Sequence, residues 1–158
     1  MIYGNKFLNE AIKIIGKSKY GYDKTDKKIN GCNIILGSTV KKEDIEENLL
    51  ALAKSFSVAN QEYKKAFNKF IEWLDNDPNY PDVTSEQIIK GTSLYEINFH
   101  IGNVKIDALK IPQGRYYEYE FCFKSGKGTD AKKVYDAAAF IMYIDENLKL
   151  QKLEFYDV

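Results

Sequence analysis

The strongest pattern along the chain is an apolar seam between residues 41 and 74, in which apolar side chains recur at steps of four and three. This spacing is typical of a helix that packs one side against other structure. The seam consists of Ile45, Leu49, Leu52, Phe56, Ala59, Tyr63, Ala66, Phe70 and Trp73. A single straight helix of this length would run close to ~50 Å at about 1.5 Å per residue, so we expect a break near Ser55–Asn60 that gives two helices. The seam could also serve a coiled-coil dimer, but without matched flanking charges it favours a helix layer on a sheet.

A second pattern is the alternation of side chains in Arg115–Phe123, which is typical of a β-strand with two different faces. One face is aromatic and the other is partly polar. The aromatic face carries Tyr117, Tyr119, Phe121 and Phe123, and the polar face carries Tyr116, Glu118, Glu120 and Cys122. Because the helical seam needs a sheet to cover, we expect this strand to be central in the sheet, with its aromatic face under the helices.

Turn residues divide the rest of the chain into further strands. A hairpin is expected at residues 20–37, with Asp23–Lys28 as its polar turn and Gly31 as a bulge. Gly102-Asn103 is expected to close a second hairpin. Residues 138–144 and 148–156 are expected to form the last one, with a bulge between Leu150 and Leu153. Ahead of these strands, Thr84–Gln87 is a capping box that starts a short helix.

The order of these elements predicts an α+β fold, with an antiparallel sheet of about five to seven strands covered on one face by a long helix or a helix pair. The 158 residues are most simply one domain. Within it we expect the hairpin at 20–37, the helical layer at 41–74 and antiparallel strands at 92–157.

Composition and charge narrow the classes of function. Lysine and arginine total 23 and aspartate and glutamate total 23, so the formal charge is zero, which disfavours non-specific binding to nucleic acid or an anionic membrane. Arg115 is the only arginine, which excludes an arginine cluster for phosphate. No apolar run approaches the roughly 18 residues of a membrane span. Cys32 and Cys122 are not spaced as a pair, so we expect a cytoplasmic protein with buried thiols.

Candidate catalytic chemistry is sparse. His100, the only histidine, could act as a general base with Asp107 as its orienting partner, but the sequence places no nucleophile beside it. The loop Lys124–Thr129 lacks the glycine and hydroxyl positions of a P-loop. No metal-ligand spacing is present, and we expect no cofactor.

The start and the polar face of the Arg115–Phe123 strand hold better candidates for binding. Arg115 and Tyr116 have the composition of an interface anchor, because arginine and tyrosine are enriched at interface hot spots. Glu118 and Glu120 lie two apart on one strand face, where paired acids could also act as acid and base or hold Mg²⁺. Together with His100, these residues form the predicted binding set.

The order of elements is similar to that of an uncharacterised family of small bacterial α+β proteins, which are domains of unknown function. The resemblance covers most of residues 20–157 and is carried by hydrophobic patterns: Tyr20-Gly21-Tyr22, the helix ending at Phe70–Leu74, Thr84–Ile89, Leu94–Phe99, and the closing segments Ala139–Met142 and Leu153–Phe155. The family has no activity to transfer. By analogy of size and class, it implies an immunity-protein-like or anti-defence function.

These observations favour a non-enzymatic protein-binding module that acts by occluding a partner. The expected partner is a toxin or a defence effector, bound in the manner of an immunity protein or a phage anti-defence inhibitor. An alternative is a small-molecule or nucleotide-binding protein that sequesters its ligand in a pocket between the helix layer and the sheet. A third reading is a small enzyme that uses His100. A homodimer is compatible with the sequence, whereas nucleic acid and membrane are not expected partners.

Overall fold

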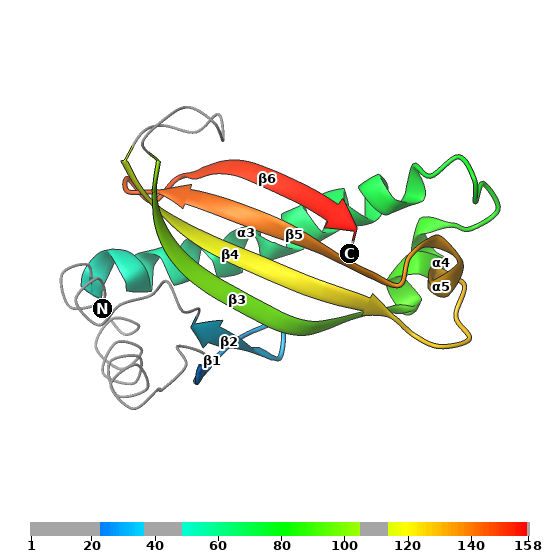
Figure 1. Ribbon diagram of the computed structural model, residues 1–158, viewed down its shortest axis with the longest axis horizontal. Helices are drawn as coiled ribbons and strands as arrows, with labels where there is room; N and C mark the ends of the chain where they lie inside the picture. Colours follow the sequence, from blue (N-terminus) through cyan, green and yellow to red (C-terminus); the bar gives the residue numbers. More distant parts are fainter. Residues whose placement is uncertain (1–22, 37–48, 105–113, 158) are drawn as a thin grey trace.

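The computed structural model describes residues 23–36, 49–104 and 114–157, which form an α+β fold (Figure 1). Six strands and three helices lie in these ranges. In chain order they are β1 (Asp23–Ile29), β2 (Cys32–Leu36), α3 (Leu49–Asp75), α4 (Ser85–Lys90), β3 (Thr92–Val104), β4 (Gly114–Ser125), α5 (Ala131–Val134), β5 (Ala137–Asp145) and β6 (Leu150–Asp157). None of these helices has the length and apolar character that a bilayer crossing requires.

The strands form one sheet in the order β1-β2-β3-β4-β5-β6. All neighbours are antiparallel except β2 and β3, which pair in parallel. The expectation of a purely antiparallel sheet was therefore wrong at one position, and the sheet is mixed. The physical reason is the long connection between β2 and β3, which contains α3 and α4. A connection of this length can carry the chain back to the end of the sheet from which β2 started.

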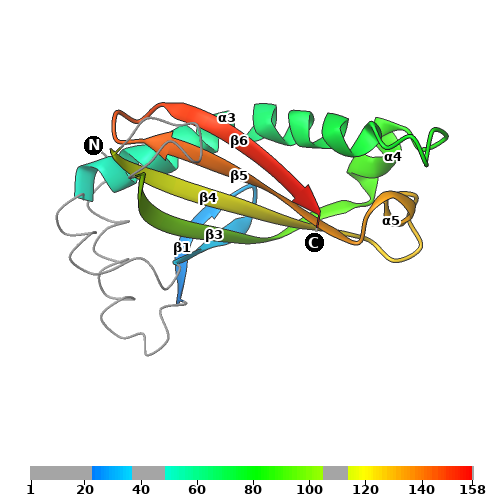
Figure 2. The same cartoon turned by 45° about the horizontal axis from the view of Figure 1, so that its top comes forward.

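Helix α3 runs without interruption from Leu49 to Asp75, so the predicted break near Ser55–Asn60 is wrong. Its 27 residues span about 40 Å at ~1.5 Å per residue. The 13 residues of β3 span a similar length, at ~3.3 Å per residue. An unbroken helix therefore matches the long strands that it packs on (Figure 2). Residues 41–48 of the predicted helical layer lie outside the described residues.

The hydrophobic core lies between α3 and the aromatic face of β4, as the two sequence patterns predicted. Tyr117, Tyr119, Phe121 and Phe123 are each at most 1% exposed. Phe70 of α3 stacks on Phe123 at 4.9 Å between ring centroids, and Tyr63 lies 5.2 Å from Phe121. The seam residues Phe56, Ala59, Tyr63, Ala66 and Phe70 are buried. Trp73 is 36% exposed and stacks on Phe155 at the edge of the core.

Two turns differ from the prediction. The first hairpin turns at Asn30-Gly31, where the two φ angles are 49° and 80°, so Asp23–Lys28 belongs to strand β1 and not to a turn. An Asn-Gly pair with positive φ at both positions is the preferred two-residue hairpin turn. Gly102-Asn103 is not a turn, because β3 continues through it and pairs Gly102 with Tyr116. The predicted return strand covers residues 104–110. Val104 is the last residue of β3, and residues 105–110, including Asp107, lie outside the described residues.

Other local predictions were confirmed. The amide of Thr84 donates to Gln87 Oε1 at 2.7 Å and the amide of Gln87 donates to Thr84 Oγ1 at 3.3 Å, which is the capping box at the start of α4. The register between β5 and β6 shifts where Tyr143 faces Lys152 and Ile144 faces Leu150, so the bulge lies between Leu150 and Leu153 as expected.

Candidate functional site

The sheet face away from the aromatic core carries glutamates and tyrosines from four adjacent strands. The register of β3 to β6 brings them together in rows that cross the sheet. One row places His100, Glu118, Tyr143 and Lys152 side by side, and the next places Asn98, Glu120, Ile141 and Glu154. Glu96, Cys122 and Tyr156 lie on the same face, and so does Tyr116. We name this surface the acid–tyrosine face; helix α3 lies on the opposite side of the sheet (Figure 2).

The structure brings four of the five predicted binding residues onto this face. His100 is directly opposite Glu118 in the antiparallel pair of β3 and β4, and Tyr116 and Glu120 lie on either side of Glu118 along β4. Arg115 does not join them. Strand alternation places it on the aromatic face, next to Tyr117, whose pKa it lowers against the larger raising effect of burial. Arg115 and Tyr116, the two residues with the composition of an interface anchor, therefore lie on opposite faces of β4.

Glu120 is the centre of a hydrogen-bond network that joins three strands. Asn98 Nδ2 donates to Glu120 Oε1 at 3.0 Å and also to Glu96 Oε2 at 3.1 Å. The thiol of Cys122 donates to Glu120 Oε1 at 3.4 Å, and the hydroxyl of Tyr156 donates to Glu120 Oε2. Charge-assisted hydrogen bonds of this kind hold a carboxylate in one orientation. These bonds hold the side chain of Glu120 and those of its partners in fixed positions.

An apolar centre lies beside this network. Ile141 is 8% and Tyr143 is 5% exposed, and they pack with the partly exposed rings of Tyr116 and Tyr156. The ring of Tyr116 lies directly over Gly102, where an added Cβ would come 2.4 Å from Cζ of the ring. A side chain at this strand position would displace the ring of Tyr116, so glycine allows the ring to lie here. The face combines an apolar centre with a charged surround.

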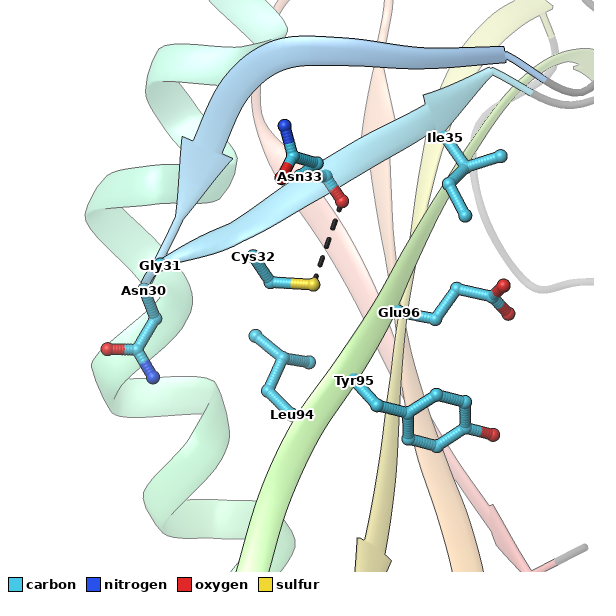
Figure 3. Close-up of a pocket in the computed structure, with 8 residues that line it drawn as sticks. All are labelled: Asn30, Gly31, Cys32, Asn33, Ile35, Leu94, Tyr95 and Glu96. Carbon is cyan, nitrogen blue, oxygen red and sulfur yellow. Dashed lines mark hydrogen bonds between the residues drawn. The ribbon is translucent and has the colours of Figure 1, made fainter.

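A bulge in β3 adds another tyrosine that sequence reasoning missed. The register between β3 and β4 shifts between Leu94 and Glu96, and Tyr95 is 47% exposed. Figure 3 shows Tyr95 and Glu96 pointing to the same side of the sheet. The pKa of Tyr95 is raised by burial and by the nearby Cys122, Glu96 and Glu120, which places its ring at the edge of the acid–tyrosine face.

The same bulge borders a pocket of about 380 Å³ between β2 and β3 (Figure 3). The two strands pair from Ile34–Ile97 to Leu36–Phe99, and the pocket lies at the Ile34 end of this pairing. It is lined by Asn30, Gly31, Cys32, Asn33, Ile35, Leu94, Tyr95 and Glu96. This position differs from the pocket between helix layer and sheet that the alternative function would use.

The main electrostatic feature of the face is the partly buried carboxyl group of Glu118. Burial, together with the smaller effects of the neighbouring carboxylates of Glu120 and Glu154, raises its pKa to about 7. The opposite effect acts on His100, whose pKa is lowered mainly by burial, against a smaller raising effect of Glu120. Near neutral pH, Glu118 therefore exchanges between its neutral and charged forms.

The raised pKa of Glu118 predicts that the stability of the folded chain depends on pH. Because the pKa of Glu118 is higher in the folded chain than its ordinary 4.5, the folded state binds more protons between pH 4.5 and 7 and loses stability as the pH rises through that window. We expect Glu118→Gln to match the wild type at pH 4. At pH 8 its melting temperature should be higher by about 2–4 °C, which is roughly 1 kcal/mol after allowing for solvent screening.

Thermal unfolding of both proteins between pH 4 and 8 measures this effect. Glu86→Gln is the matched control, because it removes the same formal charge from an exposed position on α4, where water screens the interactions of a carboxylate. A Glu118→Gln curve that runs parallel to the wild type across the whole range would contradict the raised pKa.

The predicted catalytic chemistry is not assembled in the described residues. Burial raises the pKa of Cys122, as do Glu120 and its hydrogen bond, so this thiol is not poised as a thiolate nucleophile. Asp107, the expected partner of His100, lies outside the described residues. Within the described ranges, no three His, Cys, Asp or Glu side chains are placed to hold a metal ion. Lys124 and Ser125 of the predicted loop belong to β4, and residues 126–130 lead to α5. The hydroxyl of Thr129 donates to the carbonyl of Gly126 at 2.7 Å.

No family model, curated protein or solved structure matches the chain.

Proposed function

We propose that the protein is a non-enzymatic binding module that docks on another protein through the acid–tyrosine face and occludes it. An immunity protein or a phage anti-defence inhibitor acts in this way, so a toxin or a defence effector is the kind of partner that fits. The observation that carries the proposal is the composition of the face. The exposed or partly exposed rings of Tyr95, Tyr116 and Tyr156 lie on it, the last two over the buried Ile141 and Tyr143, and glutamates lie beside them.

This arrangement has the anatomy of a protein interface. Interfaces have an apolar, aromatic centre and a polar rim, and tyrosine is enriched among the residues that carry the binding energy. Tyr143 and Ile141 are fixed by packing, and Tyr156 is fixed by its hydrogen bond to Glu120. Side chains that are already held in place lose little conformational freedom on binding, which favours affinity.

Affinity capture with the purified protein, followed by mass spectrometry and measurement of the dissociation constant, tests the proposal. The informative variant is Tyr95→Ala, because Tyr95 is 47% exposed at the edge of the face and its removal leaves the core intact. Tyr80→Ala is the matched control, because Tyr80 is 39% exposed in the loop after α3. We expect Tyr95→Ala to weaken binding of the captured protein by about tenfold or more, in the range of an interface hot spot, and Tyr80→Ala to leave it unchanged.

A second measurement addresses occlusion. The activity of the captured partner should fall in proportion to complex formation and should return with Tyr95→Ala. If Tyr80→Ala weakens binding and Tyr95→Ala does not, the docking face is wrong. If the complex forms through this face while the partner keeps full activity, docking stands and occlusion is wrong.

A further inference from the structure

The acid–tyrosine face has an excess of negative charge. Strands β3 to β6 place four glutamates and two lysines on it: Glu96, Glu118, Glu120 and Glu154, with Lys124 and Lys152. Asp145 also lies on this side, but its carboxylate is engaged by the β5–β6 turn. Since the whole chain has a formal charge of zero, the excess is a local feature of this surface.

The ammonium groups of both lysines lie over tyrosine rings of the face. Lys152 Nζ lies 6.0 Å from the ring centroid of Tyr143 and 3.4 Å from Glu154 Oε2. At the other end, Lys124 Nζ lies 5.7 Å from the ring centroid of Tyr95. A cation over a tyrosine ring is attracted by the negative face of the ring, most strongly where water is partly excluded. Two tyrosine rings of this surface, those of Tyr95 and Tyr143, thus already lie next to ammonium groups of the chain's own lysines.

Glu118 marks the place where a further cation fits. It lies between Tyr116 and Glu120 along β4, and across the sheet it faces His100 on one side and Tyr143 on the other. The ring centroids of Tyr116 and Tyr143 are 5.6 Å apart and the ring planes are inclined at 57°, so the two rings are in contact. The carboxylate has acidic neighbours in Glu120 and Glu154, both of which raise its pKa. A positive charge at this position would relieve that repulsion.

We infer that the partner presents a basic segment, and that an arginine or lysine side chain of this segment binds at Glu118, beside the partly exposed ring of Tyr116. The inference rests on the proposed docking function and names the chemistry of the surface that is covered. The partner's own basic surface would then be the part that is occluded. Nucleic acid is disfavoured as an occupant, because its phosphates would meet the glutamates of this face.

An acetylated and amidated tetra-arginine peptide is a suitable probe. Titration is followed by backbone amide signals in NMR at fixed ionic strength, with tetra-citrulline and tetra-glutamate peptides as uncharged and acidic controls. We expect tetra-arginine to shift the signals around Glu118 and Tyr143, and the two control peptides to leave them unchanged. Glu118→Gln should weaken the interaction by about fivefold to tenfold, whereas Glu86→Gln on α4 should not change it.

The pH dependence gives a second readout. Affinity for tetra-arginine should rise between pH 6 and 8 in the wild type, because Glu118 loses its proton near pH 7, and should rise less in Glu118→Gln. The other titratable or charged groups near this carboxyl are His100 on β3, Tyr116 and Glu120 on β4, Tyr143 on β5, and Lys152, Glu154 and Tyr156 on β6. Of these, His100 would also lose positive charge as the pH rises. A remaining slope in Glu118→Gln that disappears in the double variant with His100→Gln assigns the rest to His100.

The outcomes separate this inference from the proposed function. Equal loss of affinity in Glu118→Gln and Glu86→Gln, or equal shifts with tetra-citrulline, would overturn the cation site. If tetra-arginine leaves the face unperturbed while the captured partner still depends on Tyr95, docking stands and the basic partner is wrong. If tetra-arginine binds at Glu118 but the captured partner is insensitive to Tyr95, the docking proposal fails while the cation site remains.

Discussion

Phe70→Ala is expected to lower the free energy of unfolding by about 3–5 kcal/mol, the usual cost of truncating a fully buried aromatic side chain. Phe70 is 0% exposed and lies at the meeting point of helix and sheet. Its ring stacks on Phe123 at 4.9 Å and lies 5.5 Å from Phe140. Trp73 and Phe155 close the other side of the ring, each with a centroid distance of 6.2 Å. Removing the ring leaves a cavity bordered by rigid aromatic groups that cannot collapse into it.

Equilibrium unfolding in urea measures this loss. Lys69→Ala, one position earlier on the exposed side of α3, is the control, and it should change stability by no more than about 0.5 kcal/mol. Phe67→Ala is a graded comparison, because Phe67 is only partly buried and packs on Phe123 from the side, at 5.5 Å. A loss for Phe70→Ala no greater than that for Phe67→Ala would show that the helix does not pack on the sheet through Phe70.

This packing is the part of the fold that the sequence predicts best. Alternation fixes which side chains of a strand share a face, so Tyr117 and Phe123 had to lie together whatever the neighbouring strands were. The helical spacing fixes Phe56 and Phe70 on one stripe in the same way. Both are local properties of the chain. Whether α3 is broken depends on the length of the strands below it, and strand length depends on pairing with segments far away in the sequence.

The two misplaced turns show where local reasoning fails. Asn30-Gly31 and Gly102-Asn103 hold the same two residue types in opposite order. The first has two positive φ angles and closes a hairpin, whereas the second lies inside β3. Glycine at position 102 has another role: it leaves room for the ring of Tyr116 on the adjacent strand, which lies where a side chain would be. Only the pairing of β3 with β4 reveals that role.

The candidate site, too, could be predicted only in part, because only some of its residues lie on one strand. Glu118, Glu120 and Tyr116 share a strand, so their common face followed from alternation. Their neighbours Tyr143 and Glu154 come from β5 and β6, and the register that brings them beside Glu118 is not written in any local pattern. Tyr95 was missed because its side chain reaches this face through a bulge, which breaks the alternation on which the prediction depended.

The second large loss of stability is expected on replacement of Asp145, a buried carboxylate at the end of β5, where the turn to β6 begins. It is 7% exposed and accepts three hydrogen bonds. Its Oδ1 accepts from the amides of Asn147 at 2.9 Å and Lys149 at 3.0 Å, and its Oδ2 accepts from Gln151 Nε2 at 2.6 Å. The turn depends on these bonds, because it also holds Leu148 at a φ of 66°, which is unfavourable for a residue with a side chain.

Asp145→Ala should therefore cost about 2–4 kcal/mol, since hydrogen bonds to a charged group are worth about 1.5–3 kcal/mol each and their losses do not add fully. Urea unfolding and amide hydrogen exchange of β6 measure the effect, and exchange should rise first near the turn. Asp145→Asn should recover most of the stability, because its amide oxygen still accepts from the two backbone amides and Gln151 can turn its own amide to accept from the new donor. Lys149→Ala is the matched control: it keeps the backbone amide that Asp145 binds and should be neutral within about 0.5 kcal/mol. Equal stability of Asp145→Ala and Lys149→Ala would show that the turn is held by the pairing of β5 with β6 and not by the carboxylate.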